Sequence, residues 1–422
     1  MELIRTVQES IAVVHYGGPT LALLSVLVFE LPRYLMSTLA IGLFGFGRRD
    51  TLDRASPISV IIPVFNGVGG LASTVHSLRS QSANVIEVFV VDDGSRDGTL
   101  TNARALKSAG LVTRVIHHAQ RTGKSAAINH AARFAKGDLL VVVDADTVLE
   151  NPNALACLAA AFAEPSVAAA SGNITVRNTD DSLWTAFQGL EYLASITVGR
   201  SFLDILDSVA CCSGAFSMFR RHTFRNVGGM SVGPGEDLEI TLRLRRLGHD
   251  IRFVPGAEAS TRVPATLGRL VRQRLRWDRD AVSIRLFMYR QTVLGLLGER
   301  RGDTLQRLDF MIFEFYPSIL LPFYVIYVLY LFGSDTLYFL AGLYVYLFAF
   351  YALNIVVVVL ATRARLSLFD GLALFGLPVY QGIMLRAVRF YAFIIEVFFA
   401  SSRRDDFVPE RVRHALYAGA NG

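Results

Sequence analysis

The sequence predicts an α/β domain with a mainly parallel sheet, inserted between transmembrane and interfacial helices of an integral membrane protein. Apolar runs of strand length alternate with helix-like stretches over residues 51–262, a pattern typical of parallel sheets. Long apolar stretches lie on both sides of this domain, and 52% of all residues are hydrophobic, which is high for a purely soluble protein. The net charge of +6 suits an acidic substrate or a membrane surface.

Acidic residues follow two of the predicted strands. The predicted strands are the apolar runs at residues 58–62, 88–91, 112–116 and 139–143, and a helix is predicted over residues 70–81. The second run ends at Asp92-Asp93, and the fourth ends at Asp144-Ala145-Asp146. Ligands of parallel sheets collect at the carboxyl ends of the strands. We therefore expect both acidic clusters to bind a ligand.

Residues 1–50 are predicted to hold an N-terminal membrane segment. The apolar stretch over about 20–46 is long enough to cross a bilayer as one helix, although Glu30 could instead divide it into two interfacial half-helices. Arg48 and Arg49 follow this stretch. The positive-inside bias of membrane proteins then places the next domain in the cytoplasm.

The C-terminal part is predicted to return to the membrane. Residues 263–307 are arginine-rich with apolar residues at helical spacing, which predicts amphipathic interfacial helices at the cytoplasmic face; a helix packed on the globular domain has the same composition. Residues 308–402 contain two predicted spans, at 310–332 and 337–360, and a charged apolar stretch at 372–400. That last stretch is predicted to be an interfacial or re-entrant helix, or a helix pair.

The basic residues at the end of the chain complete this topology. Residues 403–422 contain several arginines and are predicted to be a cytoplasmic tail. The predicted location is the bacterial inner (plasma) membrane, crossed more than once, with the domain of residues 51–262 in the cytoplasm. No feature predicts a nucleic-acid partner.

Three clusters carry the predicted chemistry. Paired carboxylates at Asp144 and Asp146 offer hard oxygen ligands to Mg²⁺ or Mn²⁺, which could hold a sugar-nucleotide diphosphate. An isolated Asp-x-Asp is common in proteins, so its place after a predicted strand is what favours this role. Glu236-Asp237 can supply a general base, although acidic residues at a helix start also act as caps, and both roles can hold together.

The third cluster is Gln273-Arg274-Leu275-Arg276-Trp277. Its guanidinium groups suit phosphate, and its indole offers an apolar face to a sugar ring. Interfacial arginines with a tryptophan at membrane depth would explain the composition of this stretch, but not its pattern.

The three clusters occur in a fixed order ahead of an apolar C-terminal part, and here the chain resembles processive family 2 glycosyltransferases. This group contains the cellulose, chitin, hyaluronan and poly-N-acetylglucosamine synthases. The resemblance covers about residues 57–280, and it rests on the three clusters together with the stretches Val60–Asn66, Val91–Ser95, Gly123–Asn129 and Ser213–Arg220. It implies a glycosyltransferase A-type fold, a UDP-sugar donor, and Mg²⁺ or Mn²⁺ as cofactor.

The resemblance also implies roles at the nucleotide end. Val64, Asn66 and Asp93 would lie near the uridine, with Asp93 or Asp92 binding the base or ribose. Asp92-Asp93-Gly94 is equally a common turn sequence. Lys124, at a predicted helix start, would contact the diphosphate.

Further implied roles concern the metal and the reaction. Asp146 would bind the metal, and Asp144 the metal or the ribose. Asp237 would act as the general base, while Glu236 would orient Asp237 or the acceptor.

The remaining implied roles concern the acceptor end. The implied acceptor-site residues are Cys212, Ser213 and Gly214, with Trp277 beneath the acceptor sugar. Gln273 and Arg276 would lie near the diphosphate, and Arg274 belongs to the same substrate-binding set.

Two positions depart from the family pattern. Gly67 stands where many members carry an acidic residue, which puts the uridine contacts in doubt. Asp278 stands where a small residue is more usual, which puts the acceptor geometry in doubt.

The favoured function is an inverting transferase that lengthens a β-linked polysaccharide from a UDP-sugar, with glucose or N-acetylglucosamine as the favoured sugar, and helps to export the product. Its expected partners are the donor, a glycan acceptor, the lipid bilayer, and a second copy or an export partner. The first alternative is a non-processive transferase that adds one or a few sugars to a lipid or oligosaccharide. The second is an inactive scaffold or translocation subunit, against which Asp146, Asp237 and Trp277 argue.

Overall fold

The computed structural model describes residues 31–44, 51–231, 233, 235–289, 301–364 and 366–404. An eight-stranded sheet forms the centre of the α/β part, in the order β3-β2-β1-β4-β7-β6-β8-β5. The strands are β1 (Ile58–Val64), β2 (Val85–Asp92), β3 (Arg114–His117), β4 (Leu139–Val143), β5 (Val148–Leu149), β6 (Val167–Val176), β7 (Phe216–Arg220) and β8 (Asp250–Thr261).

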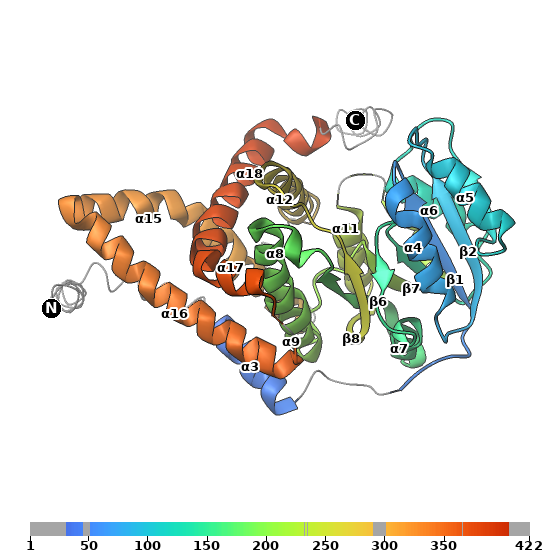
Figure 1. The fold of residues 1–422 in the computed structure, drawn as a ribbon, viewed down its shortest axis with the longest axis horizontal. Coiled ribbons are helices and arrows are strands. Elements are labelled where there is room, and N and C mark those ends of the chain that lie inside the picture. Colours follow the sequence, from blue (N-terminus) through green and yellow to red (C-terminus); the bar gives the residue numbers. More distant parts are fainter. Residues whose placement is uncertain are drawn as a thin grey trace.

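One half of the sheet is parallel and carries the predicted strands. β1 pairs in parallel with both β2 and β4, and β2 pairs in parallel with β3. The helices of this half, to the right in Figure 1, are α4 (Val68–Arg79), α5 (Thr99–Ser108) and α6 (Lys124–Ala132). The carboxyl ends of β1, β2 and β4 therefore lie at one edge, as the sequence pattern predicted.

The other half differs from the mainly parallel prediction. β7 runs antiparallel to both of its neighbours, β4 and β6, and β5 runs antiparallel to β8. Only the long pair β6 and β8 is parallel here. The sheet is therefore mixed, and the reversal begins directly beside β4.

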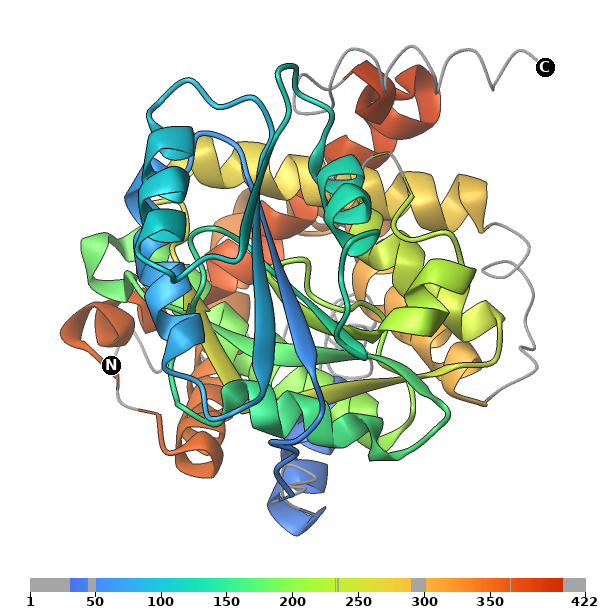
Figure 2. The same ribbon diagram turned by 90° about the vertical axis from the view of Figure 1, so that its right-hand side faces the viewer.

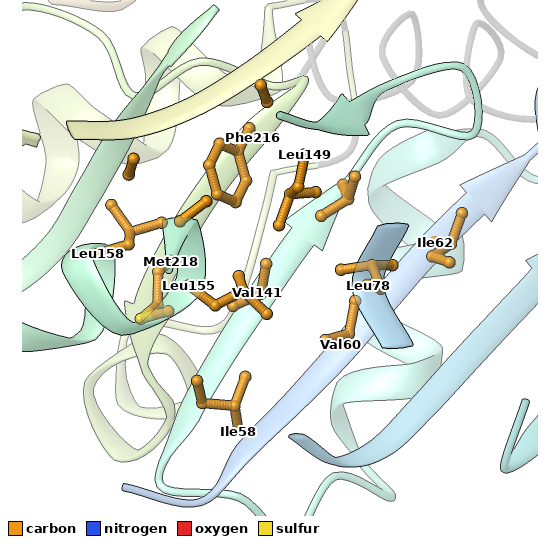
Figure 3. Packing of buried hydrophobic residues seen from close by; sticks show 14 of the residues in the cluster. Ile58, Val60, Ile62, Leu78, Val141, Leu149, Leu155, Leu158, Phe216 and Met218 are labelled. Carbon is orange, nitrogen blue, oxygen red and sulfur yellow. The ribbon is translucent and has the colours of Figure 1, made fainter. Parts of the chain in front are cut away.

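Apolar side chains fill both faces of the sheet. Figure 3 shows one face, where Ile58, Val60 and Ile62 of β1 pack with Val141 of β4, and Phe216 of β7 packs near the helix that carries Leu155. Every residue of β1 is buried. Strands buried on both faces are continuous apolar runs, which explains why these strands were predictable.

The C-terminal part is helical and lies beside the sheet domain (Figures 1 and 2). Its helices are α12 (Leu267–Val282), α14 (Arg301–Asp309), α15 (Tyr316–Phe332), α16 (Thr336–Thr362), α17 (Leu368–Val379) and α18 (Arg386–Phe399). Between it and the sheet in Figure 1 lie α8 (Leu183–Tyr192) and α9 (Arg200–Ile205), and the helix that begins with Glu236-Asp237 is α11 (Glu236–Arg246). α12 packs against α18, and α17 packs against α8.

The helical predictions hold for the parts that the structure describes. α12 forms within the predicted amphipathic stretch, while α15 and α16 match the two predicted apolar segments. The predicted stretch at 372–400 is helical from Leu368 to Phe399. Of the N-terminal segment, α3 (Leu31–Phe44) is a helix, whereas residues 1–30 and the tail beyond residue 404 lie outside the described residues.

Candidate active site

A large cavity of about 1080 Å³ opens along the carboxyl edge of the parallel strands. It extends from the ends of β1 and β2, past the start of α6 and α11, to α12 and onward to α16 and α18. Predicted residues that line it are Val64, Asn66, Asp93, Lys124, Asp144, Asp146, Ser213, Gly214, Glu236, Asp237, Gln273, Arg274, Arg276 and Trp277. The structure thus brings together side chains from all three sequence clusters.

Asp93 is the acidic residue that faces the cavity at the nucleotide end. Its carboxylate accepts hydrogen bonds from the Thr122 and Gly123 backbone N–H groups at 2.8 and 2.7 Å, and from the Thr122 hydroxyl at 2.7 Å. His118 Nδ1 lies 3.0 Å away. Burial opposes ionisation of Asp93, but these hydrogen bonds outweigh it and lower its pKa. Asp93 thereby fixes the loop that leads into Lys124.

Asp92 does not share this position. It is fully buried and bound to His117 Nδ1 at 2.7 Å, and it also accepts a hydrogen bond from the Ser95 N–H at 3.3 Å. It is not among the cavity-lining residues. Of the two predicted alternatives for binding the base or ribose, the structure therefore leaves Asp93 as the one within reach of a ligand.

The sequence departure at Gly67 has a steric reason. A Cβ at this position would lie 2.7 Å from Val64 Cγ2, and the Gly67 N–H donates to Thr99 Oγ1 at 3.0 Å. A larger residue here would require the Val64 side chain to shift. Gly70 is equally constrained, because a Cβ there would lie 2.7 Å from the Ala145 carbonyl oxygen. These glycines let α4 approach the acidic turn after β4.

Lys124 joins the two acidic clusters. Its Nζ lies 2.6 Å from Asp144 Oδ1 and 3.6 Å from Glu236 Oε1, and it donates to the Gly214 carbonyl at 3.0 Å. Burial would lower the pKa of Lys124, but the charges of Asp144 and Glu236 outweigh that effect and raise it. Lys124 is the first residue of α6, so it also stands at the positive end of a helix.

The carboxylates after β4 fit a divalent cation. Burial and the neighbouring charge of Asp144 raise the pKa of Asp146, so the pair repels itself and a cation would relieve that repulsion. Among the described residues no group of three or more His, Cys, Asp or Glu could enclose a metal. Mg²⁺ is commonly held by one or two carboxylates together with substrate phosphates, which this edge would accommodate.

Asp237 is positioned at the start of α11. Its Oδ2 accepts a hydrogen bond from the Gly214 N–H at 3.1 Å, and its Oδ1 accepts one from the Leu238 N–H at 2.8 Å. The chain enters the helix through Gly235 with φ 67°, a conformation that favours glycine. Asp237 therefore lies in the first turn of a helix and also lines the cavity, so the two positions expected for this motif occur together.

Gly214 leaves space for two charged side chains that pack against it. A Cβ at Gly214 would lie 3.2 Å from both Asp237 Oδ2 and Lys124 Nζ. The resemblance implied that this glycine permits close approach of a sugar. The geometry shows that it permits close approach of the lysine and the aspartate that face the cavity.

Cys212 lies in the core, whereas Cys211 lines the cavity. The Cys212 side chain is completely buried among apolar residues, and its N–H donates to Thr241 Oγ1 at 2.9 Å. Successive side chains of an extended segment point in opposite directions, so Ser213 and Cys211 line the cavity while Cys212 does not. Cys212 is therefore not placed to contact a ligand in the cavity, and Cys211 is the neighbouring cysteine that lines it.

Arg274 supports the tryptophan of the third cluster. Its guanidinium binds Glu191 through two contacts of 2.8 Å, and Glu191 also accepts a hydrogen bond from the Tyr380 hydroxyl at 2.7 Å. The guanidinium carbon lies 4.8 Å from the Trp277 ring centroid. Trp277 is 38% exposed and lines the cavity. Arg274 thus holds the indole, while Gln273 and Arg276 line the cavity beside it.

Asp278, the second departure from the family pattern, is not among the cavity-lining residues. It accepts a hydrogen bond from Arg389 Nε at 2.9 Å and so joins α12 to α18. Asp280, which we did not single out, does line the cavity. Its signal was present, because Gln273, Trp277 and Asp280 share one helical face at spacings of four and three. Glu191 had no comparable signal, since it comes from a distant helix.

Comparison with known proteins assigns the chain to a family. Residues 55–279 match the glycosyltransferase-like family 2. The chain belongs to this family. The matched residues include the acidic pair, Asp237 and Trp277. The mixed sheet is a glycosyltransferase A-like fold.

Three similar proteins are named for the same sugar, N-acetylglucosamine. An N-acetylglucosaminyltransferase from Azorhizobium caulinodans is 32% identical over 58% of this chain and 63% of its own length. An N-acetylglucosaminyltransferase from Rhizobium leguminosarum bv. viciae is 30% identical over 66% of this chain and 70% of its own length. A poly-β-1,6-N-acetyl-D-glucosamine synthase from Staphylococcus epidermidis is 24% identical over 57% and 58%. The chain covers less than two thirds of the length of the first of these relatives.

A solved structure extends the likeness to the helical part. A mannosyltransferase from Pyrobaculum calidifontis, solved in complex with GDP-Man and Mn²⁺, has a TM-score of 0.55 and 19% identity. The match covers 93% of this chain and 99% of that chain. At this identity the likeness is one of fold.

Proposed function

We propose that this protein is a membrane-bound, inverting glycosyltransferase that transfers N-acetylglucosamine from UDP-N-acetylglucosamine to the end of a β-linked glycan. One observation carries the proposal. A single cavity contains a paired carboxylate site, a candidate base and an exposed indole, contributed by Asp146, Asp237 and Trp277. The choice of N-acetylglucosamine over glucose rests on the activity that the similar proteins share by name.

The donor would occupy the β1–β2–β4 end of the cavity. Asp93 and Asn66 line the part suited to the uridine, and the Asp144–Asp146 turn with Lys124 lines the part suited to the diphosphate. A divalent cation held by Asp146 and Asp144 would supply positive charge to the leaving diphosphate. Arg276 of α12 and Lys124 would add charge from the protein itself.

The transfer step is a direct displacement. The acceptor hydroxyl oxygen forms a bond to the anomeric carbon while the bond from that carbon to the diphosphate oxygen breaks. Asp237 accepts the hydroxyl proton, and UDP leaves with the electron pair. One carboxylate beside the acceptor is sufficient, and the two backbone N–H bonds to Asp237 keep it pointed at the cavity.

The acceptor would lie on Trp277 and extend toward the helical part. Beyond the indole the cavity is lined by Tyr351, Gln381 and Arg386, which belong to the helices after α15. A cavity of this length supports an acceptor of several sugars, and hence elongation rather than a single transfer. Export of the product would follow these helices, with further helices supplied by a second copy or an export partner.

The apolar helices support attachment to a membrane. By length and composition, one helical run in the described part of the chain, Gly302–Thr362, could cross a membrane. It contains both α15 and α16, which meet at Gly333 (Figure 1). Large apolar side chains on both helices are exposed, such as Tyr330 at 87% and Val345 at 63%. The catalytic domain would face the cytoplasm, where sugar nucleotides are made.

Substitution of the candidate base tests the proposal. Asp237→Asn should bind UDP as the native protein does, because it removes a charge but keeps the shape of the side chain. It should lose transfer from UDP-N-acetylglucosamine by about 10²–10⁴-fold, the usual contribution of a general base. UDP affinity and UDP release, measured on the same preparation in detergent, separate these two effects.

A distant aspartate provides the control. Asp138→Asn changes an aspartate that is 72% exposed and lies outside the cavity, so it should retain native transfer. Transfer by Asp237→Asn at the native rate would remove Asp237 from the role of base. Products of only one or two added sugars from the native protein would favour the non-processive alternative.

A further inference from the structure

Asp280 is a buried carboxyl group in the acceptor half of the cavity. It lies on α12, three residues after Trp277, and it is 8% exposed yet lines the cavity. Across from it is the turn that begins α11, since a Cβ added to Gly235 would lie 3.1 Å from Asp280 Cβ. Asp280 therefore stands between the indole and the Glu236-Asp237 pair.

The carboxyl group of Asp280 has no fixed partner in the part of the chain that the structure describes. No hydrogen bond or ion pair within 4.0 Å joins its oxygens to any described residue. Asp278, on the same helix, is by contrast bound to Arg389. A buried carboxyl group without a partner costs free energy, and a ligand in the cavity that supplies a partner would recover it.

The surrounding charges favour the protonated form of Asp280. Burial, together with the charges of Glu236 and Asp237, raises its pKa to about 8. Arg276 and Arg279 on its own helix oppose this shift but do not cancel it. At neutral pH the group is therefore mostly a carboxylic acid, which can donate one hydrogen bond, unlike an ionised carboxylate.

We propose that Asp280 is a further acceptor-binding residue, whose carboxylic acid donates a hydrogen bond to an oxygen of the acceptor sugar that rests on Trp277. This inference rests on the proposed function and adds the residue that selects and orients the acceptor. A hydrogen-bond donor at Asp280, beside the base Asp237, would fix the rotation of the acceptor sugar on the Trp277 indole. This hydrogen bond would thereby direct the reacting hydroxyl of the acceptor to Asp237.

The test measures binding of the acceptor as well as turnover. A soluble β-linked N-acetylglucosamine tetramer is titrated into the full-length protein in detergent, with UDP and Mn²⁺ present, between pH 6.5 and 9.5. The native protein should lose acceptor affinity as the pH rises through about 8, because the Asp280 carboxylic acid ionises and can no longer donate a hydrogen bond. Asp280→Asn retains an N–H donor at all pH values, so it should bind the tetramer without this alkaline loss.

A second substitution tests the hydrogen bond itself. Asp280→Ala removes the donor and should weaken tetramer binding at pH 7 by about tenfold, as expected for one hydrogen bond in a buried site. Its affinity for UDP should match that of the native protein. In turnover assays the same variant should raise the KM for the acceptor more than it lowers kcat.

A neighbour on the same helix provides the control. Asp278→Asn makes the same chemical change two residues away, where the carboxylate faces α18, and it should keep the alkaline loss of affinity. If Asp280→Asn keeps the alkaline loss as well, or if Asp280→Ala binds the tetramer as tightly as the native protein, the proposal is wrong. Unchanged UDP affinity shows that each variant is folded. Absence of transfer by the native protein would instead count against the proposed function.

Discussion

Lys124 places a positive charge between the two acidic clusters of the cavity. It is the one lysine among the cavity-lining residues, and it lies between Asp144 of the metal candidate pair and Glu236 of the candidate base pair. A cation and a diphosphate bound at Asp144 would change the charge on that side of Lys124, although they would not touch Glu236 on its other side. Through Lys124, binding of the sugar nucleotide would therefore change the electrostatic potential at the candidate base pair.

Removal of one carboxylate should uncouple nucleotide binding from metal. We expect Asp146→Asn to bind UDP with the same affinity in Mn²⁺ and in EDTA, because the amide cannot replace a charged ligand of a hard cation. The native protein should bind UDP more tightly with Mn²⁺ than without it. Calorimetric titration with UDP under both conditions measures the difference, and equal affinities in the native protein would contradict a metal at this edge.

Sequence motifs predicted which parts of the chain meet at the cavity better than they predicted side-chain direction. Asp146, Asp237 and Trp277 line the cavity, and their positions were predictable because residue type and spacing together mark these motifs. Asp92 and Cys212 were placed toward the ligand, yet each points into the core while a neighbouring residue lines the cavity. In an extended segment a shift of one residue reverses the side-chain direction, and a short motif does not fix that register.

At the scale of elements, α12 joins three parts of the molecule. One face lines the cavity through Gln273 and Trp277, a second binds Glu191 of α8 through Arg274, and a third binds Arg389 of α18 through Asp278. The polar side chains of α12 thus form contacts within the protein on several faces of the helix. Polar residues on several faces occur in packed helices as well as in interfacial ones, so the arginine-rich composition did not distinguish the two.

The Glu191–Arg274 pair should be essential to the stability of this arrangement. Both side chains are nearly buried, with exposures of 13% and 11%. Glu191→Gln would leave the Arg274 charge without its partner, and we expect the free energy of unfolding to fall by about 3–5 kcal/mol. Binding of a glycan acceptor should weaken as well, because Trp277 loses its support. Thermal unfolding in detergent gives the first value, and tetramer titration gives the second.

An exposed ion pair offers the comparison for that substitution. Asp181→Asn removes a similar contact to Arg262, but its side chains are 42% and 61% exposed. A pair in solvent contributes about 0–1 kcal/mol, so this variant should unfold close to the native temperature. Equal effects of both substitutions would show that Glu191 does not hold α12 in place.

Elements with a strong local pattern were predicted well. β4 is an uninterrupted apolar run, β1 is apolar except for Ser59, and α15 and α16 are long apolar helices. β7 and the pairing of β6 with β8 were not predicted, because strand order depends on contacts between distant segments. The mixed half of the sheet was therefore outside the reach of local patterns.

At the scale of the whole molecule, the sheet domain and the helical part share one cavity. One end is lined by residues of the sheet domain, and the far end is lined by residues of α16 and α18. Each part therefore completes a surface that the other begins. A glycan lengthened at Asp237 would move from the first part to the second without leaving the protein.

Charges on the exposed face of α16 should prevent membrane insertion. Val345 and Leu353 are 63% and 64% exposed, and arginine at the centre of a bilayer costs about 2.5–3.5 kcal/mol per residue. We expect the double substitution Val345→Arg and Leu353→Arg to remove the protein from carbonate-washed membranes. Ile86→Arg, at an exposed apolar residue of β2, should leave it there. Recovery of the double variant in washed membranes at the native level would contradict a spanning role for α16.

Release of UDP from the purified protein tests the central proposal most directly. The protein, in detergent or nanodiscs, is given each common UDP-sugar with Mg²⁺ or Mn²⁺ and a β-linked N-acetylglucosamine oligomer, and the products are sized. We predict UDP release with UDP-N-acetylglucosamine and a longer oligomer that a β-N-acetylglucosaminidase digests. Folded protein that binds UDP but releases none from this donor, while turning over another sugar nucleotide, would contradict the proposed substrate. Protein that does not bind UDP at all would contradict the proposed function.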